Sequence, residues 1–172
     1  MMSTLTDPER QFLGCLMRLP ADKARHLLAG MRADDLADPV AEFVLQLAIE
    51  LVAAGQPPAP VALFVHAVDT GRAVGEHRQT WLGGWLGETY SDTTTPALAP
   101  WLKTAVLEAA WRRALGTHAR RLAHAVDGSS ADVLRDVADD TATVDELWAR
   151  YQAALDQPTR LESAPDLDTE AA

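Results

Sequence analysis

Apolar residues recur along the last third of the chain at alternating spacings of three and four positions. This spacing places them on one side of a helix and is typical of a heptad seam. The seam consists of Leu134, Val137, Thr141, Val144, Trp148, Tyr151 and Leu155. It predicts one continuous helix of about three heptads. Because two of its members are aromatic, we expect other helices rather than water to cover it.

Helices are also predicted for the rest of the chain, since runs of β-branched residues with a period of two are missing. The clearest start signals are Asp7-Pro8 and Asp38-Pro39, where a capping acid precedes a proline at the first helical position. Five short helices are predicted over about 8–18, 20–30, 39–54, 61–70 and 81–86, with a turn at 32–36. A long helix follows over about 97–126 and, at 1.5 Å per residue, spans roughly 45 Å.

These helices define an all-α fold in three parts. We predict a compact helical head of about five short helices over 1–96, followed by a long antiparallel helical hairpin over 97–156. The turn at 127–130 is short, and short connections make neighbouring helices antiparallel. The last part, 157–172, is rich in acids, prolines and small residues, and is predicted to be a disordered acidic tail.

Two helices shelter only one side of each other, and this hairpin also carries Trp101 and Trp111. Burying such a ring stabilises a fold by about 1.5–3 kcal/mol. In one arrangement the hairpin pairs with that of a second copy in a four-helix bundle across a two-fold axis. In the other it folds back onto its own head in a monomer. The first is favoured, with an interface of Leu115, Leu122, Leu134, Val137, Val144, Trp148, Tyr151 and Leu155.

Composition narrows the class of protein. Hydrophobic residues make up 48% of the 172 residues, enough for a substantial core. No run of about twenty apolar residues is present, so no membrane span is expected. The first residues lack a basic segment followed by an apolar one, so no secretory signal is expected. The single cysteine, Cys15, is interpreted as a buried small hydrophobe and fits a reducing compartment, so a cytoplasmic protein is expected.

No catalytic apparatus is recognisable among the polar residues. The chain has no G-x-x-x-x-G-K-[ST] loop, which would hold the phosphates of ATP. No two histidines are four residues apart and there is no second cysteine, so neither a metal site nor a cofactor is expected. The acidic pairs Asp34-Asp35 and Asp139-Asp140 are interpreted as solvated or capping groups. A non-enzymatic role is therefore predicted.

One cluster of basic residues is a candidate patch for nucleic acid or a partner protein: Arg112, Arg113, Arg120 and Arg121. The formal net charge of −10 argues against a chain whose main task is to neutralise phosphates. A turn centred on 128 and 129 also places Asp136 nearly opposite Arg121. Exposed pairs of this kind contribute only about 0.2–1 kcal/mol, but they neutralise the patch. Direct contact with DNA is therefore the less favoured interpretation.

Three stretches, taken in their order and spacing, are similar to a known family. The first, 7–17, has an acid, a glutamine and Leu-Gly in an opening helix. The second joins Asp34-Asp35-Leu36-Ala37-Asp38-Pro39 to Phe43, Val44 and Gly55-Gln56-Pro57. The third joins Gly83-Gly84-Trp85-Leu86, Thr93-Thr94-Thr95 and the helix 108–115 with Arg112-Arg113. Together they resemble the N-terminal domain of the bacterial replicative DNA helicase of the DnaB family, over about 6–155.

The resemblance implies a homodimer that pairs through its hairpins and contacts a primase, a replicative helicase or a helicase loader in DNA replication. These 172 residues contain no motif of the ATPase motor domain. Two alternatives stay open. The chain departs from the family pattern at Leu36-Ala37 and Ala41-Glu42, which favours a regulatory or scaffold protein for an unrelated partner. The arginine cluster favours a weak nucleic-acid-binding accessory protein.

Overall fold

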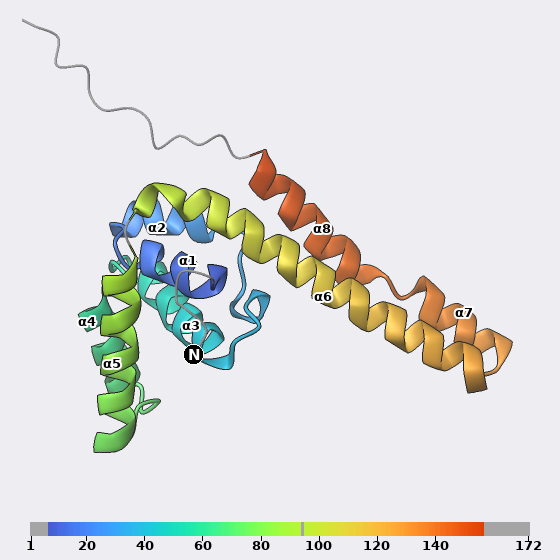
Figure 1. Cartoon of the computed structure of the whole chain (residues 1–172), viewed down its shortest axis with the longest axis horizontal. Helices are drawn as coiled ribbons and strands as arrows, with labels where there is room; N and C mark the ends of the chain where they lie inside the picture. The colour runs from blue at the N-terminus through green and yellow to red at the C-terminus, as the bar shows by residue number, and fades with distance from the viewer. Residues whose placement is uncertain (1–6, 94, 157–172) are drawn as a thin grey trace, which may run out of the picture.

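The computed structural model describes residues 7–93 and 95–156, and these residues form helices and connecting turns without a β-strand. The head contains α1 (Pro8–Leu16), α2 (Ala21–Leu28), the 3-10 helix η2 (Ala33–Asp35), α3 (Pro39–Ala53), α4 (Pro60–Asp69) and α5 (Glu76–Asp92). The 3-10 helix η3 (Pro96–Leu98) leads into α6 (Ala99–Gly128), α7 (Ala131–Asp139) and α8 (Ala142–Leu155). The predicted all-α fold, a helical head followed by a long antiparallel hairpin, is confirmed (Figure 1). The predicted acidic tail, 157–172, lies outside the described residues.

Both predicted start signals cap the helices that follow them. The Oδ1 atom of Asp7 accepts hydrogen bonds from the backbone N–H groups of Glu9 (3.1 Å) and Arg10 (3.2 Å). Asp38 caps α3 in the same way, since its Oδ1 accepts from Val40 (2.8 Å) and Ala41 (2.9 Å). In each helix a proline occupies the first turn, where a missing N–H costs nothing.

The core of the head forms around α1, which packs against α3, α5 and α6. Phe12, Leu13 and Leu16 of this helix are fully buried. Gly14 permits the closest approach, because a Cβ atom there would lie 1.8 Å from Thr93 Oγ1. Its neighbour Cys15 is 1% exposed, as predicted, and its Sγ donates to the carbonyl of Thr95 (3.3 Å).

Helix α6 belongs to both the head and the hairpin. Its first half packs on α1 and α2, and its second half continues beyond the head beside α7 and α8 (Figure 1). The residues that seat it on the head are Leu102, Lys103, Val106, Leu107 and Ala110, all buried. Burial lowers the pKa of Lys103, whose Nζ donates to the carbonyl of Ala29 at 2.7 Å.

The continuous helix predicted from the heptad seam is wrong. The chain leaves the helical path at Asp140 (ψ 67°) and Thr141, so α7 and α8 are separate helices. Local polar bonds compete with the helix at this point: the Thr141 hydroxyl donates to Asp145 (2.7 Å), and the Thr141 N–H bonds the carbonyl of Asp139 (2.9 Å). Aspartate and threonine are also poor helix formers. The apolar spacing crosses the break, but the backbone does not continue through it.

A hairpin with an exposed aromatic face

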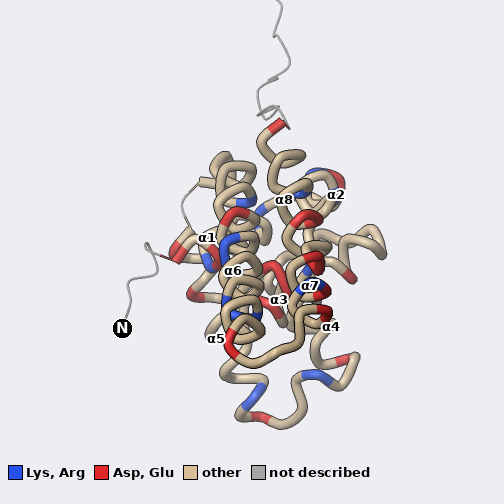
Figure 2. The backbone as a smooth tube through the Cα atoms, turned by 90° about the vertical axis from the view of Figure 1, so that its right-hand side faces the viewer, with Lys and Arg blue, Asp and Glu red and all other residues tan. Residues whose placement is uncertain are grey.

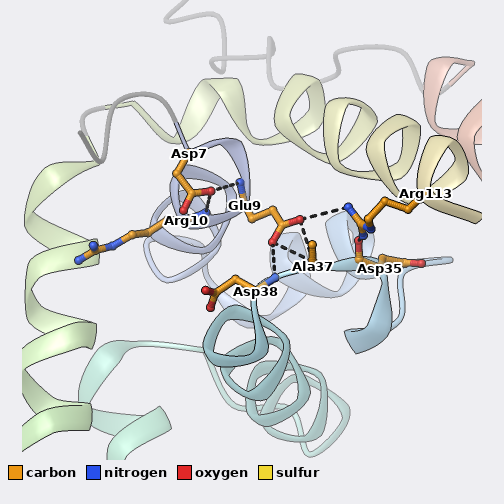
Figure 3. Close-up of polar contacts among 7 residues, drawn as sticks. All are labelled: Asp7, Glu9, Arg10, Asp35, Ala37, Asp38 and Arg113. Carbon is orange, nitrogen blue, oxygen red and sulfur yellow. Dashed lines mark hydrogen bonds and ion pairs between the residues drawn. The ribbon is translucent and has the colours of Figure 1, made fainter. Parts of the chain in front are cut away.

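The root of the hairpin is held to the head by Glu9, in the first turn of α1. Its carboxylate accepts hydrogen bonds from the N–H groups of Ala37 (2.8 and 2.9 Å) and Asp38 (3.1 Å). On its other side it forms an ion pair with Arg113 of α6 at 3.4 Å. Figure 3 shows this carboxylate between the segment that enters α3 and the arginine of α6. One side chain thus joins α1, α3 and the hairpin.

A second carboxylate, that of Asp35 in η2, fixes the returning helix. Asp35 is 2% exposed, and its Oδ2 accepts from the N–H of Arg32 (2.7 Å) and from Nη1 of Arg150 in α8 (2.7 Å). Arg150 also donates to the carbonyl of Gly30 at 3.1 Å, and Arg113 donates to the carbonyl of Asp35 at 2.5 Å. Both helices of the hairpin therefore place an arginine on the same turn of the head.

This role of Asp35 was not predicted. It does cap η2, as interpreted, but it is buried and ion-paired rather than solvated, whereas its neighbour Asp34 is exposed. A buried ion pair is strongly destabilising to break, because the remaining charge stays buried without its partner. The direction of the hairpin at its root is consequently fixed by charged contacts as well as by apolar packing.

At the level of these arginines, aromatic side chains of both hairpin helices meet at the surface. The ring centroids of Trp111 and Trp148 lie 4.8 Å apart, and those of Trp148 and Tyr151 lie 5.5 Å apart. Leu115 lies one turn after Trp111 on α6, and Leu155 lies one turn after Tyr151 on α8. Trp148 is 43% exposed, Leu115 is 40% exposed and Leu155 is 51% exposed. These five residues are called the aromatic face below.

The other predicted interface residues are half-buried: Leu122, Leu134, Val137 and Val144. The residues that α8 buries most are Leu147 and Ala154, which were not among the predicted residues. A signal for them was present, because Val144, Leu147, Tyr151 and Ala154 follow each other at spacings of three, four and three. Trp148 belongs to the edge of the packed stripe rather than to its centre.

Each arginine of the candidate basic patch has a partner within the chain. The partners are Glu108 for Arg112 (2.7 Å), Glu9 for Arg113 (3.4 Å), the hydroxyl of Thr117 for Arg120 (3.1 Å) and Asp140 for Arg121 (2.9 Å). Figure 2 shows basic positions along α6 and acidic positions along α7. The patch is thus divided between the root of the hairpin and its far end.

The predicted register of the hairpin is wrong by about one turn. Arg121 was expected opposite Asp136, but it pairs with Asp140. The physical reason is the position of the turn: α6 continues through Gly128 and α7 begins only at Ala131, so the reversal is centred later than 128 and 129. Each residue of α6 therefore lies opposite a later residue of the returning chain than was expected.

Within the described ranges, no three histidine, cysteine, aspartate or glutamate side chains come together in a group that could hold a metal ion. No described helix combines the length and the apolar character needed to cross a membrane.

Taken together, the geometry defines an all-helical domain with a compact head and a projecting hairpin that displays aromatic side chains. This architecture is that of the N-terminal domain of DnaB helicase. The chain is similar to the crystal structure of that domain from Mycobacterium tuberculosis, with a TM-score of 0.62 and 21% identity over 85% of this chain and 94% of that chain. No protein-family model and no curated protein sequence matches the chain. The predicted resemblance is confirmed for the fold.

Proposed function

We propose that this protein is a non-enzymatic interaction domain that forms a homodimer through its hairpin and contacts a protein of the DNA replication machinery. The observation that carries the proposal is the aromatic face, which combines a partly exposed Trp148 with ring contacts to Trp111 and Tyr151. Large aromatic side chains of this kind dominate the binding energy of protein interfaces.

A second copy is the partner that best fits this face. The rings of Trp111 on α6 and of Trp148 and Tyr151 on α8 contact one another across the antiparallel helix pair. Two such pairs can bury each other's apolar side chains in a four-helix bundle. An isologous contact across a two-fold axis requires only one kind of surface. The proposed interface consists of Leu115, Leu122, Leu134, Val137, Val144, Trp148, Tyr151 and Leu155.

The likeness to the N-terminal domain of a helicase supports a role in replication. Within that role, a primase, a replicative helicase or a helicase loader is the proposed partner, in the cytoplasm. Co-purification of the full chain with each of these proteins from its host tests this part. Capture of at least one of them at stoichiometric levels supports it, and capture of none favours a regulatory or scaffold role for an unrelated partner.

The dimer is tested by light scattering on the full chain and on Trp148→Asp. We expect the wild type to have twice the chain mass of 18.6 kDa and the variant to have the chain mass, because a carboxylate is costly to bury in an apolar interface. Ala149→Asp is the matched control, since Ala149 is exposed and is not one of the proposed interface residues, so its variant should stay dimeric.

Far-UV circular dichroism completes the test. Helicity close to the wild-type level is expected in both variants, because Trp148 lies at the edge of the packed stripe. A wild-type chain that is monomeric at high concentration contradicts the dimer. Loss of helicity in Trp148→Asp alone would place this ring in the core of a monomer.

A further inference from the structure

The two halves of the hairpin are anchored very differently. Nearest the head, α6 is seated by buried apolar residues up to Ala110, and α8 is held by the pair between Arg150 and Asp35. Farther out, α6 buries only Ala125, and α7 buries no residue at all. Segments with few buried apolar contacts open and move at a low cost in free energy. Below, residues 99–115 with 142–155 are called the anchored half and residues 116–140 the distal half.

Both helical arms of the hairpin have a weak point where these halves meet. On α6 the weak point is Gly116, where an added Cβ would meet only the far end of the Arg120 side chain, at 4.0 Å. No close packing requires glycine at this position, and glycine inside a helix lowers its stability and permits kinks. On the returning arm the weak point is the non-helical step at Asp140 and Thr141, between α7 and α8.

The two weak points lie at nearly the same level along the hairpin. Asp140 pairs with Arg121, which follows Gly116 by five residues, a rise of about 7.5 Å along the helix. From Asp140 the chain runs back towards the head, so Thr141 lies nearer still to the level of Gly116. The pair between Arg121 and Asp140 joins two residues of the distal half and therefore does not oppose bending between the halves.

We propose that Gly116 and the step at Asp140 and Thr141 together form a hinge, with one point on each arm of the hairpin. The distal half of the hairpin swings about it as one unit, while the anchored half stays fixed to the head. The role of this motion rests on the proposed function. Trp111 and Trp148 lie in the anchored half and meet a partner as a preformed surface. The distal half then adjusts its angle to that partner, carrying Leu122, Leu134 and Val137 with it.

The hinge is tested by distance measurements between pairs of spin labels on the full chain. Exposed alanines provide the sites: Ala53→Cys on α3 is combined with Ala138→Cys on α7, or with Ala153→Cys on α8. Burial raises the pKa of Cys15 to about 11, so this thiol stays unlabelled. Labelled chains are diluted into an excess of unlabelled chain, so that each distance is measured within one copy.

We expect a broader distance distribution to Ala138→Cys than to Ala153→Cys, by an amount on the order of one helical turn, about 5 Å. Gly116→Ala should narrow the first distribution and leave the second unchanged, since alanine stiffens the helix without a clash. Gly87→Ala is the matched control, because Gly87 is a helical glycine of the head with open space around it, and it should change neither distribution.

A distal distribution as narrow as the anchored one overturns the proposal, and so does a distal distribution that does not respond to Gly116→Ala. Light scattering on the same samples separates this result from the proposed function. A monomer with a mobile distal half contradicts the dimer and leaves the hinge intact, whereas a dimer with two narrow distributions does the reverse.

Discussion

The head and the hairpin are built from the same kind of element but gain their stability in different ways. In the head, the central apolar side chains of α1 and α3 are 0% exposed: Phe12, Leu13, Leu16, Val44, Leu45 and Leu47. In the hairpin, Trp148, Leu115 and Leu155 keep about 40% or more of their surface exposed. The hairpin tolerates this because α6 takes its stability from the head, where its first half is buried. A helix shared between two regions can thus carry apolar residues that a free hairpin could not afford to expose.

The largest expected effect lies where the two regions join. Asp35→Ala removes the buried carboxylate that pairs with Arg150 at 2.7 Å and leaves this largely covered arginine only the more distant Glu146, at 3.9 Å; it should lower the free energy of unfolding by about 3–5 kcal/mol. Urea unfolding followed by circular dichroism measures this effect. Asp34→Ala, at the exposed neighbouring position, serves as the control and should change stability by less than about 0.5 kcal/mol. Equal effects of the two variants would show that the ion pair does not hold the hairpin to the head.

A pair of matched truncations compares the two regions directly. Leu13→Ala empties a fully buried site in the head and should cost about 2–5 kcal/mol. Leu115→Ala removes a side chain that is 40% exposed and should cost less than about 1 kcal/mol in the monomer. The measurement is urea unfolding at a protein concentration low enough to keep the chain monomeric. A larger loss for Leu115→Ala than for Leu13→Ala would reverse the comparison.

A smaller effect, confined to the head, depends on pH. The pKa of Glu50 is lowered from 4.5 to about 2, and the largest cause is the hydrogen bond from Gln46. The bonds from Arg72 and His66 contribute to the same lowering, and burial opposes it. A carboxyl group with a lowered pKa in the folded state stabilises the fold above about pH 4.5 and loses this contribution as the pH falls towards 2.

Glu50→Gln should therefore reduce the dependence of unfolding free energy on pH between about 2 and 4.5, a window set by the shifted and ordinary pKa values. Urea unfolding at a series of pH values measures the slope for wild type and variant. Identical slopes would mean that the bonds to Gln46, Arg72 and His66 do not favour the charged carboxylate.

Features fixed by neighbouring residues were predictable from the sequence. The caps at Asp7 and Asp38 depend on groups two or three residues away, so the signal lies within one turn. The order of head and hairpin follows from these helix boundaries. The break at Asp140 and Thr141 is also local, but the apolar spacing continues across it and conceals it.

Features that depend on distant residues were not predictable. The partner of Asp35 lies 115 positions later in the chain, and no pattern around either residue announces the contact. Within the candidate site, the aromatic residues were found because their spacing is helical. Two adjacent apolar stripes run along α8, one through Leu147 and one through Trp148. Packing against α6 buries the stripe with Leu147 and leaves the larger Trp148 exposed, and the spacing alone does not predict this choice.

The only thiol of the chain, Cys15, lies in the middle of the head, and burial keeps it protonated at neutral pH. Two folded copies consequently cannot become linked by a disulfide bond. Any association between copies follows the law of mass action, and oxidation cannot lock it with a covalent bond.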